Sequence, residues 1–93
     1  MNKKNITNAR SKIDKIDNKI FDLIKKRTEI VKYMLSQKKF KKDIVDKNRE
    51  NKILKRIKLK SIKNKVDTNI TNFIWKSIIL SYTKYQKKNF RKK

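Results

Sequence analysis

The chain has 93 residues and a formal net charge of +22, because 30 lysines and arginines stand against eight acidic residues. Such an excess usually indicates a nucleic acid or an acidic membrane as partner. Here only five of the 30 basic residues are arginines, asparagine and isoleucine are abundant, and glycine and proline are absent. An A/T-rich genome produces such a composition in any protein, so the charge is weak evidence about partners. The absence of cysteine and histidine excludes disulfides, thiolate and imidazole chemistry and the usual zinc sites.

The first residues of the chain contain no apolar core of signal-peptide length, and no window approaches a membrane span. We therefore expect a cytoplasmic, all-helical protein with a single domain over residues 1–93. Any enzyme built from this chain must work by positioning and electrostatics, and we expect no metal and no cofactor.

The segment from Ile6 to Lys38 carries the strongest pattern in the chain. Its apolar residues repeat in heptads without an intervening glycine or proline, which predicts one continuous helix over about residues 5–38, roughly 50 Å long. The remaining residues supply two shorter helices, too few to cover this seam in a monomer. We therefore expect a second copy of the chain to pack along it. The two seam positions hold Ile6, Ile13, Ile20, Arg27 and Met34, and Ala9, Ile16, Leu23, Ile30 and Gln37.

Arg27 distinguishes this seam from an ordinary coiled coil. A guanidinium among apolar side chains is costly to desolvate unless an anion meets it, and no acidic residue occupies an adjacent seam position. A ligand can supply this anion. In a chain that uses lysine wherever a point charge suffices, arginine indicates a planar group that binds a carboxylate through two parallel hydrogen bonds. Arg10, Arg27 and Arg49 are therefore candidates for a carboxylate site, although A/T-rich arginine codons offer a simpler explanation.

Residues 39–45 are interpreted as a basic loop, and a second helix is predicted over residues 46–62. Asp46 is a short polar acceptor ahead of an apolar periodic run, which is typical of an N-cap. Helix N-termini attract anions, and Arg49 and Glu50 lie in this first turn. A solvated first turn is the alternative interpretation of these two residues.

A third helix is predicted over residues 67–88, with Asp67 or Thr68 as its cap. Apolar residues fall on nearly every face, so we expect it to be buried on several sides and to supply most of the aromatic core. From Lys87 onward we expect the chain to be frayed, with a basic tail over residues 89–93.

The candidate residues form an ordered set along the chain. The set runs through Arg10, Ile13, Ile16 and Asp17, then Leu23, Ile24 and Arg27, then Lys38, then Asp46, Arg49 and Glu50, and then Ile78, Ile79 and Gln86. At these spacings it resembles the all-helical chorismate mutases over about residues 9–88. The resemblance implies an intertwined homodimer of three-helix chains. It also implies a cofactor-free isomerase that converts chorismate to prephenate in phenylalanine and tyrosine biosynthesis.

The same resemblance implies a role for each site residue. The two substrate carboxylates are bound by Arg27 and by the partner's Arg10, with Arg49 near them at the rim. Asp46 offers its backbone and caps the helix, and Glu50 accepts a hydrogen bond from the ring hydroxyl. Lys38 and Gln86 point at the ether oxygen. The implied catalytic residues are Arg27, Lys38, Glu50 and Gln86, and all the residues named in this paragraph are implied to bind substrate.

Two departures from the family pattern affect details of this assignment. The loop between Lys38 and Arg49 is one residue shorter than in the family, which changes the position of Asp46 relative to the family pattern. Family members often carry a serine four residues before the glutamine, where this chain has Tyr82 and the nearest serine is Ser81. Either Tyr82 replaces that hydroxyl in the substrate site or the register differs by one, and Ser81 is left out of the site.

The spacing of two arginines supports a shared site independently. Arg10 and Arg27 lie 17 residues apart, about 25 Å along a helix, which is too far for both to hold one small ligand within a chain. If the helix pairs antiparallel about its midpoint, Arg10 of the second copy comes opposite a point between Arg27 and Lys38. Two-fold symmetry then builds two equivalent sites.

Three other functions stay open at this point. An isochorismate pyruvate lyase has the same architecture and a similar cationic pocket. A small basic nucleic-acid-binding protein would explain the charge but gives no reason for Glu50 or for Arg27 in the seam. An inactive scaffold that regulates a partner enzyme of the pathway would differ only in its kinetics.

Overall fold

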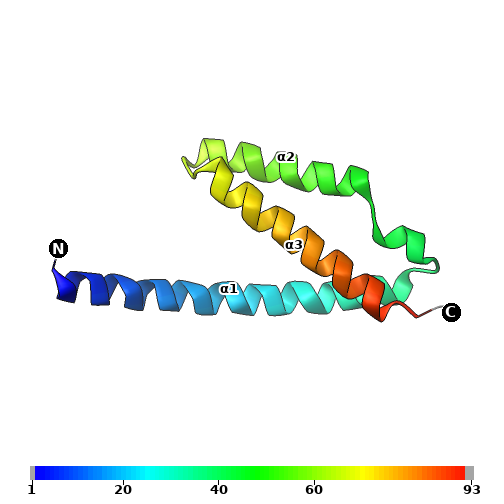
Figure 1. Ribbon diagram of the computed structural model, residues 1–93, viewed down its shortest axis with the longest axis horizontal. Helices are drawn as coiled ribbons and strands as arrows, with labels where there is room; N and C mark the ends of the chain where they lie inside the picture. Colours follow the sequence, from blue (N-terminus) through cyan, green and yellow to red (C-terminus); the bar gives the residue numbers. More distant parts are fainter. Residues whose placement is uncertain (1, 92–93) are drawn as a thin grey trace. The chain divides into compact units, whose positions relative to one another are not determined.

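The computed structural model describes residues 2–91, which form three α-helices and one short 3₁₀ helix (Figure 1). The helices are α1 (Lys3–Gln37), η1 (Lys41–Ile44), α2 (Lys47–Lys63) and α3 (Thr68–Asn89). The predicted all-helical class with a very long first helix is therefore confirmed. By its internal contacts the chain divides into two compact units, one ending at Lys32 and one beginning at Tyr33. Within residues 2–91, no helix combines the length and the apolar character needed to cross a membrane.

Helix α1 begins earlier than the sequence predicted because Asn2 caps it. The side-chain oxygen of Asn2 accepts a hydrogen bond from the backbone N–H of Lys4 at 2.9 Å, and its carbonyl accepts from Ile6. The helix then runs without a break to Gln37. Its predicted seam is exposed in a single chain: Ile13 and Ile16 are each 54% exposed, and Leu23 and Ile30 are more so. An apolar stripe of this length is what a second chain would cover.

The segment after α1 is more ordered than the predicted basic loop. It contains η1, whose Ile44 is buried, and the Lys42 ammonium lies 5.5 Å from the centre of the Phe40 ring. Ile44 packs η1 against the rest of its unit, where η1 contacts α3. This apolar anchor fixes the chain between Lys38 and Asp46 without glycine or proline.

Helices α2 and α3 form an antiparallel pair joined by residues 64–67 (Figure 1). At the end of α2, Lys65 has a φ of 57°, the left-handed conformation that usually falls to glycine. The N–H of Val66 donates to the carbonyl of Ser61 at 2.9 Å and that of Lys65 donates to Ile62 at 3.2 Å, the hydrogen bonds of a Schellman motif. Lysine takes this position in a chain that has no glycine.

The contact between α2 and α3 combines apolar side chains with a hydroxyl pair. Ile53 and Ile57 of α2 are buried, as is Ser61 one turn further along. The Ser61 hydroxyl donates to the carbonyl of Ile57 and lies 2.7 Å from the Thr71 hydroxyl of α3, with which it shares a hydrogen bond. Because every one of these polar groups has a partner, the pair costs little to bury.

Two predictions about α3 are wrong for the single chain. The helix is not buried on several sides, since Phe73 is 74% exposed and Gln86 is its one buried residue within the described part of the chain. Its neighbours α2 and η1 cover only part of its circumference, so the aromatic residues do not form the core. The helix also continues to Asn89, whose side chain donates to the carbonyl of Tyr85, rather than fraying from Lys87. Lys92 and Lys93 of the predicted tail lie outside the described residues.

Candidate active site

Two of the predicted site residues meet directly in the unit that begins at Tyr33. The Lys38 ammonium donates a hydrogen bond of 2.7 Å to Oε1 of Gln86, across 48 positions of sequence. Lys38 follows the last residue of α1 and is half-buried, and Gln86 lies near the end of α3 and is buried. The contact therefore ties the end of α1 to the end of α3 through side chains rather than backbone.

The direction of this hydrogen bond decides what the pair can offer a ligand. An ammonium has three N–H donors, of which Gln86 takes one, so Lys38 retains two. The Gln86 oxygen is occupied by Lys38, which leaves the amide NH₂ as the group that can turn to a ligand. Both side chains thus present donors, and one of them is charged. Such a pair suits an oxygen atom that gains negative charge.

The first turn of α2 brings three more predicted residues together. The Asp46 side chain accepts a hydrogen bond of 3.0 Å from the N–H of Arg49, and its carbonyl accepts one of 3.0 Å from the N–H of Glu50. Asp46 is therefore an N-cap, as predicted. Because the Asp46 side chain is used as the cap, the Arg49 guanidinium and the Glu50 carboxylate are the charged groups of this turn that remain candidates to bind a ligand.

Glu50 has a partner that the sequence reasoning missed. The Lys47 ammonium lies 3.6 Å from a Glu50 carboxylate oxygen, and Glu50 is much less exposed than Lys47. The spacing of Lys47 and Glu50 indicates such a pair, because residues three apart on a helix are neighbours. Because Lys47 is exposed, this ion pair contributes little to stability. The contact involves one oxygen of the Glu50 carboxylate and leaves the second oxygen for another donor.

Glu50 also lines a hollow between α2 and α3. The hollow has a volume of about 590 Å³, and its wall includes apolar Leu54 and Ile79 together with Thr83. The sequence reasoning included Ile79 in the resemblance but gave no role to Thr83. A carboxylate beside apolar walls and a hydroxyl can accept a hydrogen bond from a polar ligand.

The remaining predicted residues occupy α1 and α3. Arg10 is exposed and Arg27 half-buried, and 17 residues of one continuous helix separate them, about 25 Å. The structure of one chain therefore does not bring Arg10 and Arg27 together. Tyr82 is half-buried on α3, one turn before Gln86 and on the same face.

Comparisons with known proteins identify the family. A sequence model of the family described as chorismate mutase type II matches residues 9–87 of the 93. Curated proteins and solved structures give no match. The matched segment extends from the residue before Arg10 to the residue after Gln86 and so contains every candidate site residue. The chain therefore belongs to the chorismate mutase type II family, whose enzymes are isomerases that convert chorismate to prephenate.

Proposed function

We propose that two copies of this chain form a chorismate mutase with two shared sites, each completed by the partner's Arg10. In each site Arg27 and the partner's Arg10 bind the two carboxylates of chorismate, and Arg49 adds positive charge at the rim. Glu50 accepts a hydrogen bond from the ring hydroxyl, and Tyr82 contacts the substrate from α3. Lys38 and Gln86 donate to the ether oxygen. The aromatic amino acid pathway, the cytoplasmic location and any partner enzyme stay predictions.

The observation that carries this proposal is the hydrogen bond between Lys38 and Gln86. The Lys38 Nζ and the Gln86 Oε1 lie 2.7 Å apart, so the two side chains present one charged and one neutral donor side by side. The reaction breaks a C–O bond while it forms a C–C bond within one molecule, and negative charge develops on the ether oxygen. Fixed donors at that oxygen stabilise the transition state more than the ground state, which is the condition for a faster reaction.

The second contribution to rate is conformational. Chorismate must fold so that its side chain lies over its ring before the two ends can react. Charged groups that grip both carboxylates hold this compact shape and remove the entropy of finding it. The reaction needs no nucleophile and no general base, which agrees with a chain that lacks cysteine and histidine.

The exposed seam of α1 supports the homodimer. Ile13, Ile16 and Leu23 are each more than half exposed in a single chain, although they recur at heptad spacing. An antiparallel pairing about the helix midpoint covers these side chains in both copies. The same pairing places the partner's Arg10 between Arg27 and Lys38, because Arg10 lies as far before the midpoint as that point lies after it.

The proposal is tested by following the loss of chorismate and the appearance of prephenate with purified protein, beside Arg27→Ala and Arg56→Ala variants. Arg56 is an exposed arginine of α2 with no assigned role, so it controls for the loss of one positive charge. Prephenate formation that Arg27→Ala abolishes and Arg56→Ala retains is expected. A second arm with isochorismate distinguishes a pyruvate lyase, which would release pyruvate from isochorismate and leave chorismate largely unchanged. That result would overturn the proposed function.

A further inference from the structure

The hollow that Glu50 lines has two polar side chains in its half-buried part. One is Glu50 itself, which comes from α2, and the other is Thr83, which comes from α3. The lysines and the asparagine that also line the hollow are exposed. A ligand that enters the hollow therefore meets one carboxylate and one hydroxyl between apolar walls. The half-buried apolar residues of these walls are Val45, Leu54 and Ile79.

The hydroxyl of Thr83 is not used within the chain. In a helix, the hydroxyl of a threonine or serine can donate to the carbonyl four residues before it. Thr7, Thr28 and Ser61 each make this hydrogen bond. The Thr83 hydroxyl has no hydrogen-bond partner among the described residues. Because its proton is not committed to the carbonyl of Ile79, Thr83 can offer a ligand both a donor and an acceptor.

Glu50 and Thr83 complement each other toward a ligand hydroxyl. A carboxylate only accepts hydrogen bonds, so Glu50 can bind the proton of that hydroxyl but not its oxygen. The ion pair with Lys47 involves one carboxylate oxygen and leaves the other for this contact. Thr83 can donate to the oxygen of the same ligand hydroxyl from the opposite helix. A ligand carboxylate would be repelled by Glu50 and an ether would offer it no proton, so a hydroxyl is the group that satisfies both side chains.

We propose that Thr83 is a specificity residue of the substrate site and that Glu50 and Thr83 together recognise the ring hydroxyl of chorismate. This assignment rests on the proposed function, in which Glu50 accepts a hydrogen bond from that hydroxyl. Thr83 adds a hydrogen bond to the hydroxyl oxygen. The ring hydroxyl takes no part in the bonds that form and break, so the contact is made in the ground state as well as in the transition state. Its loss therefore raises KM and leaves kcat nearly unchanged.

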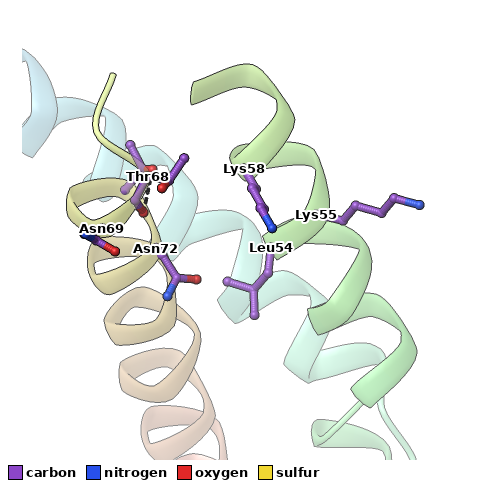
Figure 2. A pocket seen from close by; sticks show the side chains of 7 residues that line it. Leu54, Lys55, Lys58, Thr68, Asn69 and Asn72 are labelled. Atoms are coloured by element: carbon purple, nitrogen blue, oxygen red, sulfur yellow. Dashed lines mark hydrogen bonds between the residues drawn. The ribbon is translucent and has the colours of Figure 1, made fainter. Parts of the chain in front are cut away.

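A second hollow of the same helix pair supplies a matched control. It has a volume of about 480 Å³ and lies between α2 and the start of α3. Figure 2 shows Leu54 extending from α2 toward α3 and Asn72 extending from α3 toward α2. Thr68 lines this hollow and is half-buried like Thr83, but no carboxylate lines it among the described residues. Thr68→Val therefore makes the same chemical change as Thr83→Val on the same helix, away from Glu50.

Steady-state and inhibition kinetics with the full chain test the assignment. The probes are chorismate and its analogue in which hydrogen replaces the ring hydroxyl, whose binding is measured as its inhibition constant against chorismate. Thr83→Val keeps the shape of the side chain and removes its hydroxyl. It is expected to raise KM for chorismate about three- to tenfold, as the loss of one hydrogen bond does, and to change the inhibition constant of the analogue less than about twofold. Thr83→Ser and Thr68→Val are expected to leave both constants within about twofold of the wild type.

Circular dichroism melting of each variant establishes that it is folded before the constants are compared, and Thr83→Ala makes the same comparison if the valine variant is unfolded. An equal rise of KM and of the inhibition constant would mean that Thr83 only shapes the hollow, and the assignment would be wrong. An unchanged KM would overturn it as well. In both cases turnover of chorismate by the wild type leaves the proposed function standing. A wild-type chain that converts no chorismate would overturn the proposed function, and the assignment of Thr83 with it.

Discussion

The hydrogen bond between Lys38 and Gln86 brings together two residues that are far apart in sequence and that are proposed to act on one substrate atom. Lys38 alone would be a mobile ammonium at a helix end, and Gln86 alone would be a buried amide with a free choice of orientation. Their hydrogen bond restrains the lysine and engages the amide oxygen, so the NH₂ is the part of the amide left for a ligand. Preorganised donors of this kind stabilise developing charge without reorganising during the reaction.

Lys38→Ala is expected to lower kcat for chorismate by about a hundredfold or more, as the loss of one oxyanion donor does in other enzymes. Lys39→Ala is the control, because Lys39 is the next residue, is exposed and has no assigned role. Steady-state kinetics with both variants make the comparison. A Lys38→Ala enzyme with near-normal kcat would remove Lys38 from the chemistry.

Lys65 offers a stability test at a single backbone position. A non-glycine residue in the left-handed region is strained, so Lys65→Gly is expected to raise the free energy of unfolding by about 1 kcal/mol. Lys63→Gly places glycine in the last turn of α2 instead and is expected to lower it by about 1 kcal/mol. Urea unfolding gives both values. Destabilisation by Lys65→Gly would show that the lysine side chain itself holds the turn.

At the scale of elements, the N-caps of α2 and α3 allow the effect of a cap on stability to be distinguished from its effect on substrate binding. Asp46 caps α2 and Asp67 caps α3, each by accepting a backbone hydrogen bond. Replacing either by alanine is expected to cost about 0.5–2 kcal/mol of stability. Only Asp46→Ala is expected to raise KM for chorismate as well, because its cap positions Arg49 and Glu50. Equal KM values in the two variants would leave Asp46 a structural residue.

The element scale also shows which features sequence patterns can predict. Heptad spacing and the absence of helix breakers predicted α1. Residue type and position predicted Asp46 as the cap of α2 and left Asp67 and Thr68 as candidates for the cap of α3, which is Asp67. The start of α1 was missed because Asn2 precedes the apolar repeat that signals the helix. The exposure of α3 was missed for a different reason. Apolar residues on every face predict burial somewhere, but the pattern does not say whether the same chain or another one provides it.

The candidate site was named from the sequence through the resemblance to a family. That resemblance proposed Arg10, Lys38, Glu50 and Gln86, and their roles stay predictions. Contacts between side chains were not predicted, since the pairing of Lys38 with Gln86 depends on how two distant helix ends meet. The Lys47–Glu50 pair was visible in the spacing, but several lysines surround Glu50 in the sequence, and spacing alone does not choose among them.

Dimer formation through α1 is tested by placing a charge in the seam. Ile16→Asp buries a carboxylate twice in a two-fold dimer and is expected to convert the protein to a monomer. Asn18→Asp makes a similar charge change two residues away, outside the seam positions, and is expected to leave the dimer intact. Sedimentation velocity at equal concentrations distinguishes them. A wild-type chain that sediments as a monomer, or an Ile16→Asp variant that remains dimeric, would contradict the seam interface.

At the scale of the whole molecule, the net charge and the apolar seam of α1 have opposite effects on dimer formation. A net charge of +22 on each chain repels a second copy, so the apolar seam of α1 must overcome this repulsion for a dimer to form. The same charge attracts a doubly negative substrate to the sites. A chain without cysteine and histidine can use such a field, because the proposed catalysis depends on holding and stabilising negative charge.

The central claim is that each active site takes Arg10 from one chain and Lys38 from the other, and subunit mixing tests it most directly. Arg10→Ala and Lys38→Ala homodimers are each expected to be nearly inactive. After the two are unfolded together and refolded at equal amounts, half of the dimers should be mixed, and each of these has one intact site of two. Recovery of about a quarter of wild-type activity is therefore expected. No recovery, with mixed dimers shown to be present by differential tagging, would mean that Arg10 serves its own chain.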